Sequence, residues 1–109
     1  MAPKSLVTAR QARAAVVRLK KQLSASGIPV QSVYLFGSYA KGTPRAWSDI
    51  DVAVVSARFG KDFTKESVLL NRIADGINPL IEAHPLHPRD LADRWSTFSQ
   101  EILKTGKKI

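Results

Sequence analysis

The sequence predicts an α/β or α+β fold in which helices flank a small mixed sheet. Two observations support this prediction. Apolar residues recur at helical spacing in three separate segments, and shorter apolar runs with strand character lie between them. With 109 residues, of which 44% are hydrophobic and 24% charged, the chain has the size and composition of one globular domain, expected to span residues 1–109.

The first helix and the first strand are recognised by their ends. Residues 8–26 carry apolar residues at helical spacing, and Gly27 followed by Pro29 is expected to end the helix. Val33–Phe36 is a short apolar run typical of a buried strand, and it stops at Gly37. The expected inward stripe of the helix is Ala12, Val16, Leu19 and Leu23.

A helical turn, a loop and a second strand follow. Ser38–Lys41 is long enough for one turn of helix, and a loop opened by Thr43-Pro44 runs to Ser48. Asp49–Val55 is the clearest strand of the chain, because apolar residues alternate along it and form one apolar face. That face consists of Ile50, Val52 and Val54.

The second half of the chain is predicted to add a helix, a strand and a helix. The first of these helices spans about Phe63–Asp75, with Leu69 and Ile73 facing inward and Gly76 as its stop. Pro79–Leu86 is a weaker strand candidate.

The last helix is expected to open at Pro88 and to close at Gly106. The expected catalytic core, about residues 28–88, is therefore flanked by helices at about 8–26 and 89–105. The inward residues of the last helix are predicted to be Leu91, Trp95, Phe98 and Ile102.

Composition excludes several classes of protein. The chain has no cysteine, which rules out disulfides and thiolate metal sites. No apolar run approaches the roughly 20 residues that span a bilayer, and the first residues lack an apolar signal core, so no membrane partner and a cytoplasmic location are expected.

The net charge of +8 has two interpretations. It can attract an anionic partner, whether a nucleotide, a nucleic acid or an acidic protein surface, or it can be a solvated basic surface that keeps the protein in solution. Much of the excess lies near the two ends of the chain, at Arg10, Arg13, Arg18, Lys20, Lys21, Lys104, Lys107 and Lys108.

Gly37-Ser38 is a candidate phosphate-binding turn. A strand that ends there and enters a helical turn leaves backbone N–H groups and a local dipole that favour phosphate oxygens. Gly37 lets the backbone approach a ligand, and the hydroxyl of Ser38 can donate one more hydrogen bond. Lys41 and Arg45 are candidates to add positive charge, although a Gly-Ser pair alone is also consistent with a simple turn.

Asp49 and Asp51 are a candidate metal-binding pair. Because alternate side chains of a strand share a face, the two carboxylates are expected to project on the same side. Neighbouring carboxylates repel unless a cation lies between them, and magnesium commonly takes one or two carboxylates together with water and substrate phosphate. The alternative is a solvated strand edge or an Asp that caps a turn. Since strands disfavour Asp, two of them on one face of an apolar strand favour a functional role.

These motifs carry a family resemblance. Gly37-Ser38-Tyr39-Ala40-Lys41-Gly42 and Ser48-Asp49-Ile50-Asp51 resemble the signature of the DNA polymerase beta-like nucleotidyltransferase superfamily. The short length and the spacing are most similar to the minimal nucleotidyltransferases, and the resemblance covers roughly Val33–Leu86. It implies a nucleotidyltransferase (polymerase beta-like) fold.

The resemblance also implies roles for individual residues. Gly37 and Ser38 would hold the triphosphate of ATP, with Lys41 and Ser48 as further nucleotide-binding candidates. Asp49 and Asp51 would bind magnesium, and Glu82 is the natural candidate for the third carboxylate; if Glu82 does not serve, Glu66 is an alternative.

The implied reaction is attack of an acceptor hydroxyl on the α-phosphorus of ATP, which transfers AMP and releases pyrophosphate. Two Mg²⁺ ions about 3.5–4 Å apart would stabilise the attacking and leaving oxygens. Glu82 would complete the site of the metal that lowers the pKa of the acceptor hydroxyl, or act as its base.

The acceptor implied by analogy is a partner protein, a HEPN-domain toxin, which would make this chain its antitoxin. Two alternatives remain open. One is a non-catalytic nucleotide-binding module that neutralises a partner by binding, and the other is a nucleic-acid-binding subunit that uses its basic ends. The sequence does not decide between homo- and hetero-oligomers.

Three weaker signals carry less weight. Ser38–Lys41 fits S-x-x-K and Lys104–Gly106 fits K-T-G of penicillin-binding enzymes, but S-D-N is absent and K-T-G falls at a helix end. Glu82, His84 and His87 suggest a zinc site, but Pro85 and Pro88 break the helical spacing that such a motif needs, and packing roles are favoured. Among the aromatic side chains, Trp95 and Phe98 are expected mainly in the core, and Trp47 is open to substrate contact.

Overall fold

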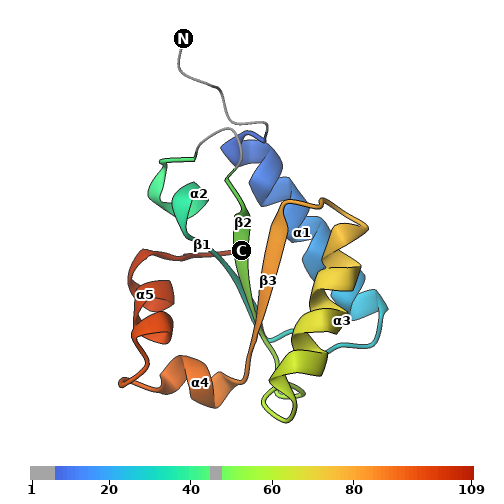
Figure 1. The fold of residues 1–109 in the computed structure, drawn as a ribbon, viewed down its shortest axis with the longest axis vertical. Helices are drawn as coiled ribbons and strands as arrows, with labels where there is room; N and C mark the ends of the chain where they lie inside the picture. The colour runs from blue at the N-terminus through green and yellow to red at the C-terminus, as the bar shows by residue number, and fades with distance from the viewer. Residues whose placement is uncertain (1–6, 45–47) are drawn as a thin grey trace.

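The computed structural model describes residues 7–44 and 48–109, and it confirms the predicted mixed α/β class. Within these residues, four strands form one sheet and five helices surround it (Figure 1). The helices are α1 (Ala9–Ala25), α2 (Ser38–Lys41), α3 (Phe63–Asp75), α4 (Pro88–Ala92) and α5 (Thr97–Thr105). The strands are β1 (Ser32–Phe36), β2 (Ile50–Val55), β3 (Ile81–Leu86) and β4 (Lys107–Lys108).

The strand order is β3-β2-β1-β4, and the sheet is mixed. β1 runs antiparallel to β2 and to β4, whereas β2 and β3 are parallel. The parallel connection is made by α3, as expected for a crossover between parallel strands. Since β3 is an edge strand, its outer backbone groups need partners from elsewhere.

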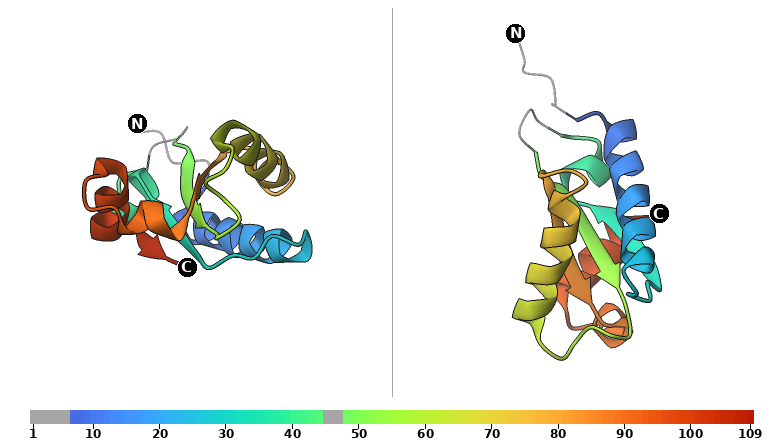
Figure 2. Two further views of the ribbon diagram at one scale, coloured as in Figure 1. Left: turned by 90° about the horizontal axis from the view of Figure 1, so that it is seen from below. Right: turned by 90° about the vertical axis from the view of Figure 1, so that its right-hand side faces the viewer.

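Helices cover both faces of the sheet, as the two views of Figure 2 show. On one face, α1 and α3 pack on the larger core, to which β2 contributes Ile50, Val52 and Val54. On the other face, the end of α5 packs through Ile102 on a smaller cluster that contains Ala53 and Val55. The alternation predicted for β2 is therefore confirmed, and Asp51 shares the face of Ala53 and Val55.

The ends of α1 agree with the sequence prediction. The hydroxyl of Thr8 accepts a hydrogen bond from the backbone N–H of Gln11, and the side chain of Gln11 accepts one from the N–H of Thr8, which forms a capping box. At the other end Gly27 takes a φ of 84° beyond the C-cap Ser26. All residues predicted for the inward stripe are buried, namely Ala12, Val16, Leu19 and Leu23.

The predicted inward face of α3 was partly wrong. Its bounds agree with the sequence, and Ile73 packs on the core. However, Leu69 is 44% exposed, whereas Leu70 and Ala74 are fully buried. The helix is rotated from the expected stripe because Asn71 must face β3, and this rotation carries Leu69 toward solvent.

The prediction of one continuous C-terminal helix was also wrong. The helix breaks after Ala92, where Asp93 adopts an extended ψ of 103° and its carboxylate accepts from the backbone N–H of Trp95. Ser96 then caps α5 by accepting from the N–H of Ser99. Asp and Ser favour such local hydrogen bonds over helix continuation. Because of the break, Trp95 is 83% exposed instead of buried, while Phe98 and Ile102 do pack against the sheet.

The short edge strand β4 was not predicted. Lys107 pairs with Leu35 and Lys108 with Tyr34, and the backbone N–H of Ile109 donates to the carbonyl of Val33 at 2.9 Å. Ile109 also packs against the larger core. A two-residue strand of lysines carries no alternation or β propensity from which it could be recognised. Among the described residues, no helix has both the length and the apolar character needed to cross a bilayer.

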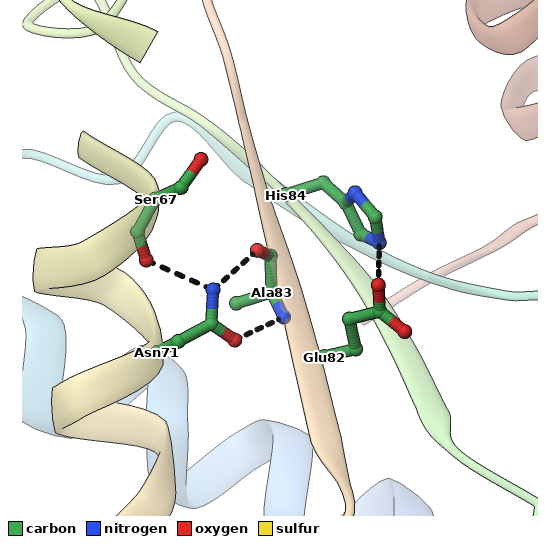
Figure 3. Close-up of polar contacts among 5 residues, drawn as sticks. All are labelled: Ser67, Asn71, Glu82, Ala83 and His84. Carbon is green, nitrogen blue, oxygen red and sulfur yellow. Dashed lines mark hydrogen bonds and ion pairs between the residues drawn. The ribbon is translucent and has the colours of Figure 1, made fainter. Parts of the chain in front are cut away.

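Asn71 of α3 ties the helix to the open edge of β3 (Figure 3). Its amide oxygen accepts from the backbone N–H of Ala83 at 2.9 Å, and its amide nitrogen donates to the carbonyls of Ala83 and Ser67 at 2.9 and 2.8 Å. The side chain thus takes the place of a neighbouring strand at Ala83. It holds the stretch of β3 that carries Glu82 and His84 on either side of Ala83.

Replacing Asn71 by alanine is expected to lower the free energy of unfolding by about 2 kcal/mol, because the N–H and C=O of buried Ala83 lose their partners. Urea denaturation measures this loss. The neighbouring exposed Arg72→Ala is the matched control and should change stability by less than about 0.5 kcal/mol. Equal effects of the two substitutions would contradict the role assigned to the Asn71 amide.

Candidate active site

The strand pairing brings three chain segments to one end of the sheet. The antiparallel register of β1 and β2 pairs Phe36 with Asp51, so Gly37 leaves β1 beside the start of β2. The parallel register of β2 and β3 pairs Asp51 with Glu82. Residues that are far apart in the sequence therefore lie on adjacent strands, which are ~4.8 Å apart in a sheet.

Gly37 lies directly against the carboxylate of Asp51. Its backbone has a φ of 72° and a ψ of −149°, a combination available almost only to glycine. A Cβ atom built on Gly37 would clash with Oδ2 of Asp51 and would lie 3.1 Å from its Cγ. Glycine is thus required at this position for two reasons, the backbone conformation and the close approach to Asp51.

Buried side chains hold the helical turn that follows Gly37. Tyr39 and Ala40 of α2 are buried, and the hydroxyl of Tyr39 donates to the carbonyl of Val7 at 2.8 Å. This contact ties α2 to the segment that precedes α1. The exit of β1, including Gly37 and half-buried Ser38, is thereby fixed beside the acidic residues.

Asp51, Glu82 and His84 form a cluster of three groups that can bind a metal. One ligand atom from each residue lies within 4.8 Å of the others. Asp51 and His84 are half-buried, whereas Glu82 is exposed. Asp51 and Glu82, two of the three predicted metal ligands, are therefore brought together, whereas the cluster does not include Asp49. Asp49 lies just before β2, is exposed, and is close enough to affect the titration of Asp51.

The electrostatics of this cluster favour a cation. The pKa of Asp51 is raised from 3.8 to about 6, first because burial disfavours the charged carboxylate, and then because of repulsion by Glu82, Asp49 and Glu101. The carboxylates thus gather around Asp51 although the protein as a whole carries a net charge of +8. A divalent cation would relieve this repulsion, and oxygen ligands of this kind suit magnesium.

His84 packs between aromatic rings next to the acids. Its ring centroid lies 5.4 Å from that of Phe36 and 5.5 Å from that of Phe98. Burial lowers the pKa of His84, while Glu82 acts in the opposite direction with Oε1 3.8 Å from Nε2 (Figure 3). The imidazole is therefore neutral at pH 7 and can accept a hydrogen bond or ligate a metal.

Lys41 is bound to α5. Its Nζ lies 3.1 Å from Oε1 of Glu101, and both side chains are half exposed. This ion pair joins α2 to α5 beside Asp51. Ser48, the other predicted nucleotide-binding residue, is half-buried just before β2. Arg45 and Trp47 lie outside the described residues.

Two residues considered for the site lie elsewhere. His87 caps α4, where its Nδ1 accepts from the backbone N–H of Arg89 at 3.0 Å, so the zinc hypothesis that joins it to Glu82 and His84 is not supported. Glu66 accepts hydrogen bonds from the three backbone N–H groups of residues 60–62 in the loop before α3. Burial raises the pKa of Glu66, but these hydrogen bonds outweigh it, and the pKa is lowered. That loop follows the far end of β2, opposite to Asp51.

Sequence reasoning missed Glu101 and Asn71. Glu101 looks like an ordinary exposed helix residue, and nothing in its local sequence connects it to Asp51. Asn71 did carry a signal, because it interrupts the apolar run that includes Leu70 and Ile73. A polar residue on the inward side of a helix needs a partner, which here is the edge of β3.

The sequence of the chain is similar to those of known nucleotidyltransferases. The profile of a family described as "nucleotidyltransferase domain" matches residues 16–104. A protein adenylyltransferase, MntA of Shewanella oneidensis, is 29% identical over 80 residues, which are 73% of this chain and 53% of the relative. The chain thus spans about half the length of this curated relative.

Solved structures show the same fold. A chain from a toxin–antitoxin crystal structure with AMP-PNP aligns with a TM-score of 0.62 and 26% identity over 86% of this chain and 68% of that chain. A variant of the toxin–antitoxin pair MntA-HpeT gives a TM-score of 0.58 and 28% identity over 84% and 68% of the two chains. A Sulfolobus solfataricus protein, 21% identical, gives a TM-score of 0.57 over 92% and 84%, and at that identity supports the fold alone.

Gly37→Ala is expected to weaken Mn²⁺ binding at least about tenfold, because the new Cβ displaces the carboxylate of Asp51. Mn²⁺ suits the same oxygen ligands as Mg²⁺ and can be followed by calorimetry. Gly42→Ala is the control. It also has a positive φ, 74° with a ψ of 21°, which strains alanine less than the backbone of Gly37 does, and nothing lies within 4 Å of the position that its new Cβ would occupy. Equal losses of affinity in both variants would show that backbone strain, and not contact with Asp51, is responsible.

Without metal, the raised pKa of Asp51 should make the protein less stable as the pH rises from about 4 to about 6. In this range the folded carboxyl binds more protons than the unfolded one, so the free energy of unfolding falls as the pH rises, and the fall ends once the folded carboxyl has also ionised. Asp51→Asn should remove this part of the pH dependence. Above pH 6 it should be more stable than the wild type by about 1 kcal/mol, a value reduced for solvent screening of the half-exposed group.

The measurement is the free energy of unfolding in urea from pH 4 to 8, with a chelator present. The charge-matched control is Asp75→Asn, an exposed carboxyl at the end of α3. It should retain the wild-type profile between pH 4 and 6. An unchanged profile in Asp51→Asn would contradict the assignment of this titration to Asp51.

Proposed function

Because the chain belongs to the nucleotidyltransferase domain family, we propose that it transfers AMP from ATP to an acceptor hydroxyl. Its resemblance to the minimal nucleotidyltransferases is confirmed by the family match and by the similarity to MntA. The observation that carries the proposal is the placement of Gly37 and Glu82 on either side of Asp51. The end of β1 and the carboxylates of Asp51 and Glu82 therefore lie next to one another.

The exit of β1 would bind the triphosphate. Gly37 presents backbone without a side chain next to Asp51, and Ser38 offers a hydroxyl directly after it. Lys41 is bound to Glu101 at 3.1 Å, so its contribution to phosphate binding would require exchange of this ion pair. Ser48 is a further proposed contact at the entrance to β2.

Asp49, Asp51 and Glu82 would hold Mg²⁺, with two ions proposed. The clustered carboxylates and the raised pKa of Asp51 fit such a cation. When bound, Mg²⁺ neutralises charge that develops on the phosphate oxygens. The neutral imidazole of His84 lies beside Glu82 and restricts where that carboxylate can point.

Glu82 is the proposed group at the acceptor end. Its side chain is more exposed than that of Asp51, so a hydroxyl from a second molecule can reach it. The hydroxyl oxygen forms a bond to the α-phosphorus, the bond to pyrophosphate breaks, and the hydroxyl proton passes to the Glu82 carboxylate. Asp51, held by Gly37 and β1, keeps the nucleotide end of the site in place.

The proposed acceptor is a side-chain hydroxyl of a partner protein, expected to be a HEPN-domain toxin. The similarity to MntA, named a protein adenylyltransferase, and to chains from toxin–antitoxin structures supports this. The chain would then act as an antitoxin in a hetero-oligomer. We further propose that residues 1–109 form one catalytic domain.

The test uses ATP labelled on the α-phosphate, Mg²⁺ and the protein encoded by the neighbouring gene. Label should pass to that protein, and Asp49→Asn, Asp51→Asn and Glu82→Gln should each lower the rate at least about a hundredfold. Asp75→Asn is the matched control for loss of one exposed carboxylate and should retain the rate within about twofold.

Two outcomes would contradict the proposal. If no label is transferred, and the double variant Asp49→Asn with Asp51→Asn still neutralises the partner, the chain is a non-catalytic binding module. If Glu82→Gln alone retains the wild-type rate, Glu82 is not the third carboxylate. Glu66 is then an unsuitable replacement, because it is bound to the loop of residues 60–62.

A further inference from the structure

The positive charge of the chain comes from its first 48 residues. These residues contain no Asp or Glu, and the first acidic residue is Asp49. Eight of the 17 Lys and Arg residues lie in this segment, whereas residues 49–109 carry nine basic and nine acidic residues. The net charge of +8 is therefore not spread over the surface, as a general solubility device would be, but belongs to the segment that contains α1.

The local physics of α1 does not explain its basic residues. Arg10 lies in the first turn, where the helix dipole disfavours cations, and Arg13 is three residues further on, so the two repel each other. The helix contains no acidic residue that could offset this repulsion. These arginines cost α1 stability, which suggests a role outside the folding of the helix.

The fold brings α1 next to the basic C-terminal strand (Figure 2). Arg10, Arg13 and Lys107 line one surface hollow of about 280 Å³. Lys20 and Lys21 line a second hollow, of about 470 Å³, together with Ile109, whose carbonyl accepts from Nζ of Lys20 at 3.3 Å. We call this region the α1–β4 basic surface, formed by Arg10, Arg13, Lys20, Lys21 and Lys107.

Among the described residues, the cations of this surface have no acidic partner, and apart from Lys20, whose Nζ donates to the carbonyl of Ile109, they are exposed. In residues 7–44 and 48–109, no Asp or Glu side chain lies within ion-pair distance of any of the five, whereas Lys41 on the other face is paired with Glu101. Four of the five lie in a stripe along α1, and Arg10 and Lys21 are separated by about 17 Å at 1.5 Å per residue.

We propose that the α1–β4 basic surface binds the phosphodiester backbone of a nucleic acid. Over about 17 Å, a duplex presents about ten phosphate charges. Such a row of negative charges matches the row of cations better than an isolated acidic side chain would. The guanidinium groups of Arg10 and Arg13 are suited to bidentate phosphate contacts. Of the large apolar residues near the row, Val17 and Ile109 are half-buried, so the surface lacks the exposed aromatic anchors typical of protein interfaces.

This binding site is independent of the proposed transfer reaction. Lys107 pairs with Leu35, whose side chain belongs to the larger core on the α1 face of the sheet. Asp51, in contrast, shares the opposite face with Ala53 and Val55. Substitutions on the basic surface therefore leave the acidic cluster intact.

The experiment measures binding of the full chain to fluorescent 20-mers by anisotropy, with single-stranded RNA, duplex RNA and duplex DNA of mixed sequence, at about 50 to 300 mM salt. The affinity should fall steeply with salt, with a slope of log K against log salt of about −3 to −4 when most of the five cations contact phosphates. The three probes show which polymer is preferred.

The double variant Arg10→Gln with Arg13→Gln should make the slope less steep by about 2 and weaken binding at least about tenfold. Arg89→Gln with Arg94→Gln is the matched control. It removes the same charge from exposed sites at α4 and the break after it, and should retain the wild-type slope. Circular dichroism verifies that α1 is still folded in both variants.

Three results would overturn the proposal. The first is no binding of any probe at low salt. The second is an equal loss in both double variants, which would mean that net charge alone attracts the polymer. The third is equally tight binding of polyglutamate of the same charge, which would indicate an acidic protein as the partner of this surface.

Discussion

The register of β2 and β3 places the carboxylates of Asp51 and Glu82 next to each other although they repel, and the rest of the candidate site depends on this constraint. Parallel pairing of β2 with β3 sets these residues side by side, and the two strands cannot slip without moving their apolar faces out of the core. Burial of Asp51 adds to this cost and raises its pKa to about 6. The hydrophobic core thus maintains a local concentration of negative charge that is unfavourable by itself, and binding of a cation is the simplest way to relieve it.

Several otherwise unrelated features keep this strained arrangement in place. Asn71 supplies the missing edge partners of β3, so the strand that carries Glu82 stays paired. Gly37 allows β1 to end against the carboxylate of Asp51, where any side chain would collide with it. Tyr39 holds the following turn by its hydrogen bond to Val7. None of these three residues belongs to the acidic cluster, yet each restricts the position of a segment next to it.

Much of this could be predicted from sequence, because the informative signals are local. The Asp49–Val55 alternation, the glycine after β1 and the bounds of α1 each depend on neighbours along the chain, and the structure agrees with each of them. What failed was non-local. The exposure of Trp95 follows from a break that Asp93 and Ser96 induce within an apolar pattern of helical spacing. Likewise, Leu69 is exposed and Leu70 is buried because α3 turns Asn71 toward the edge strand β3, which its local sequence does not reveal.

Charge is distributed in the molecule according to the same topology. The acidic residues begin at Asp49, the residue that precedes β2, and the uncompensated basic residues precede it in α1. Since α1 and the Asp51 side chain lie on opposite faces of the sheet, the hydrophobic layer separates the negative cluster from the basic surface. Were both on one face, the arginines would neutralise the carboxylates and remove the reason for a cation to bind. The separation lets one small fold offer a cation site on one face and an anion-binding surface on the other.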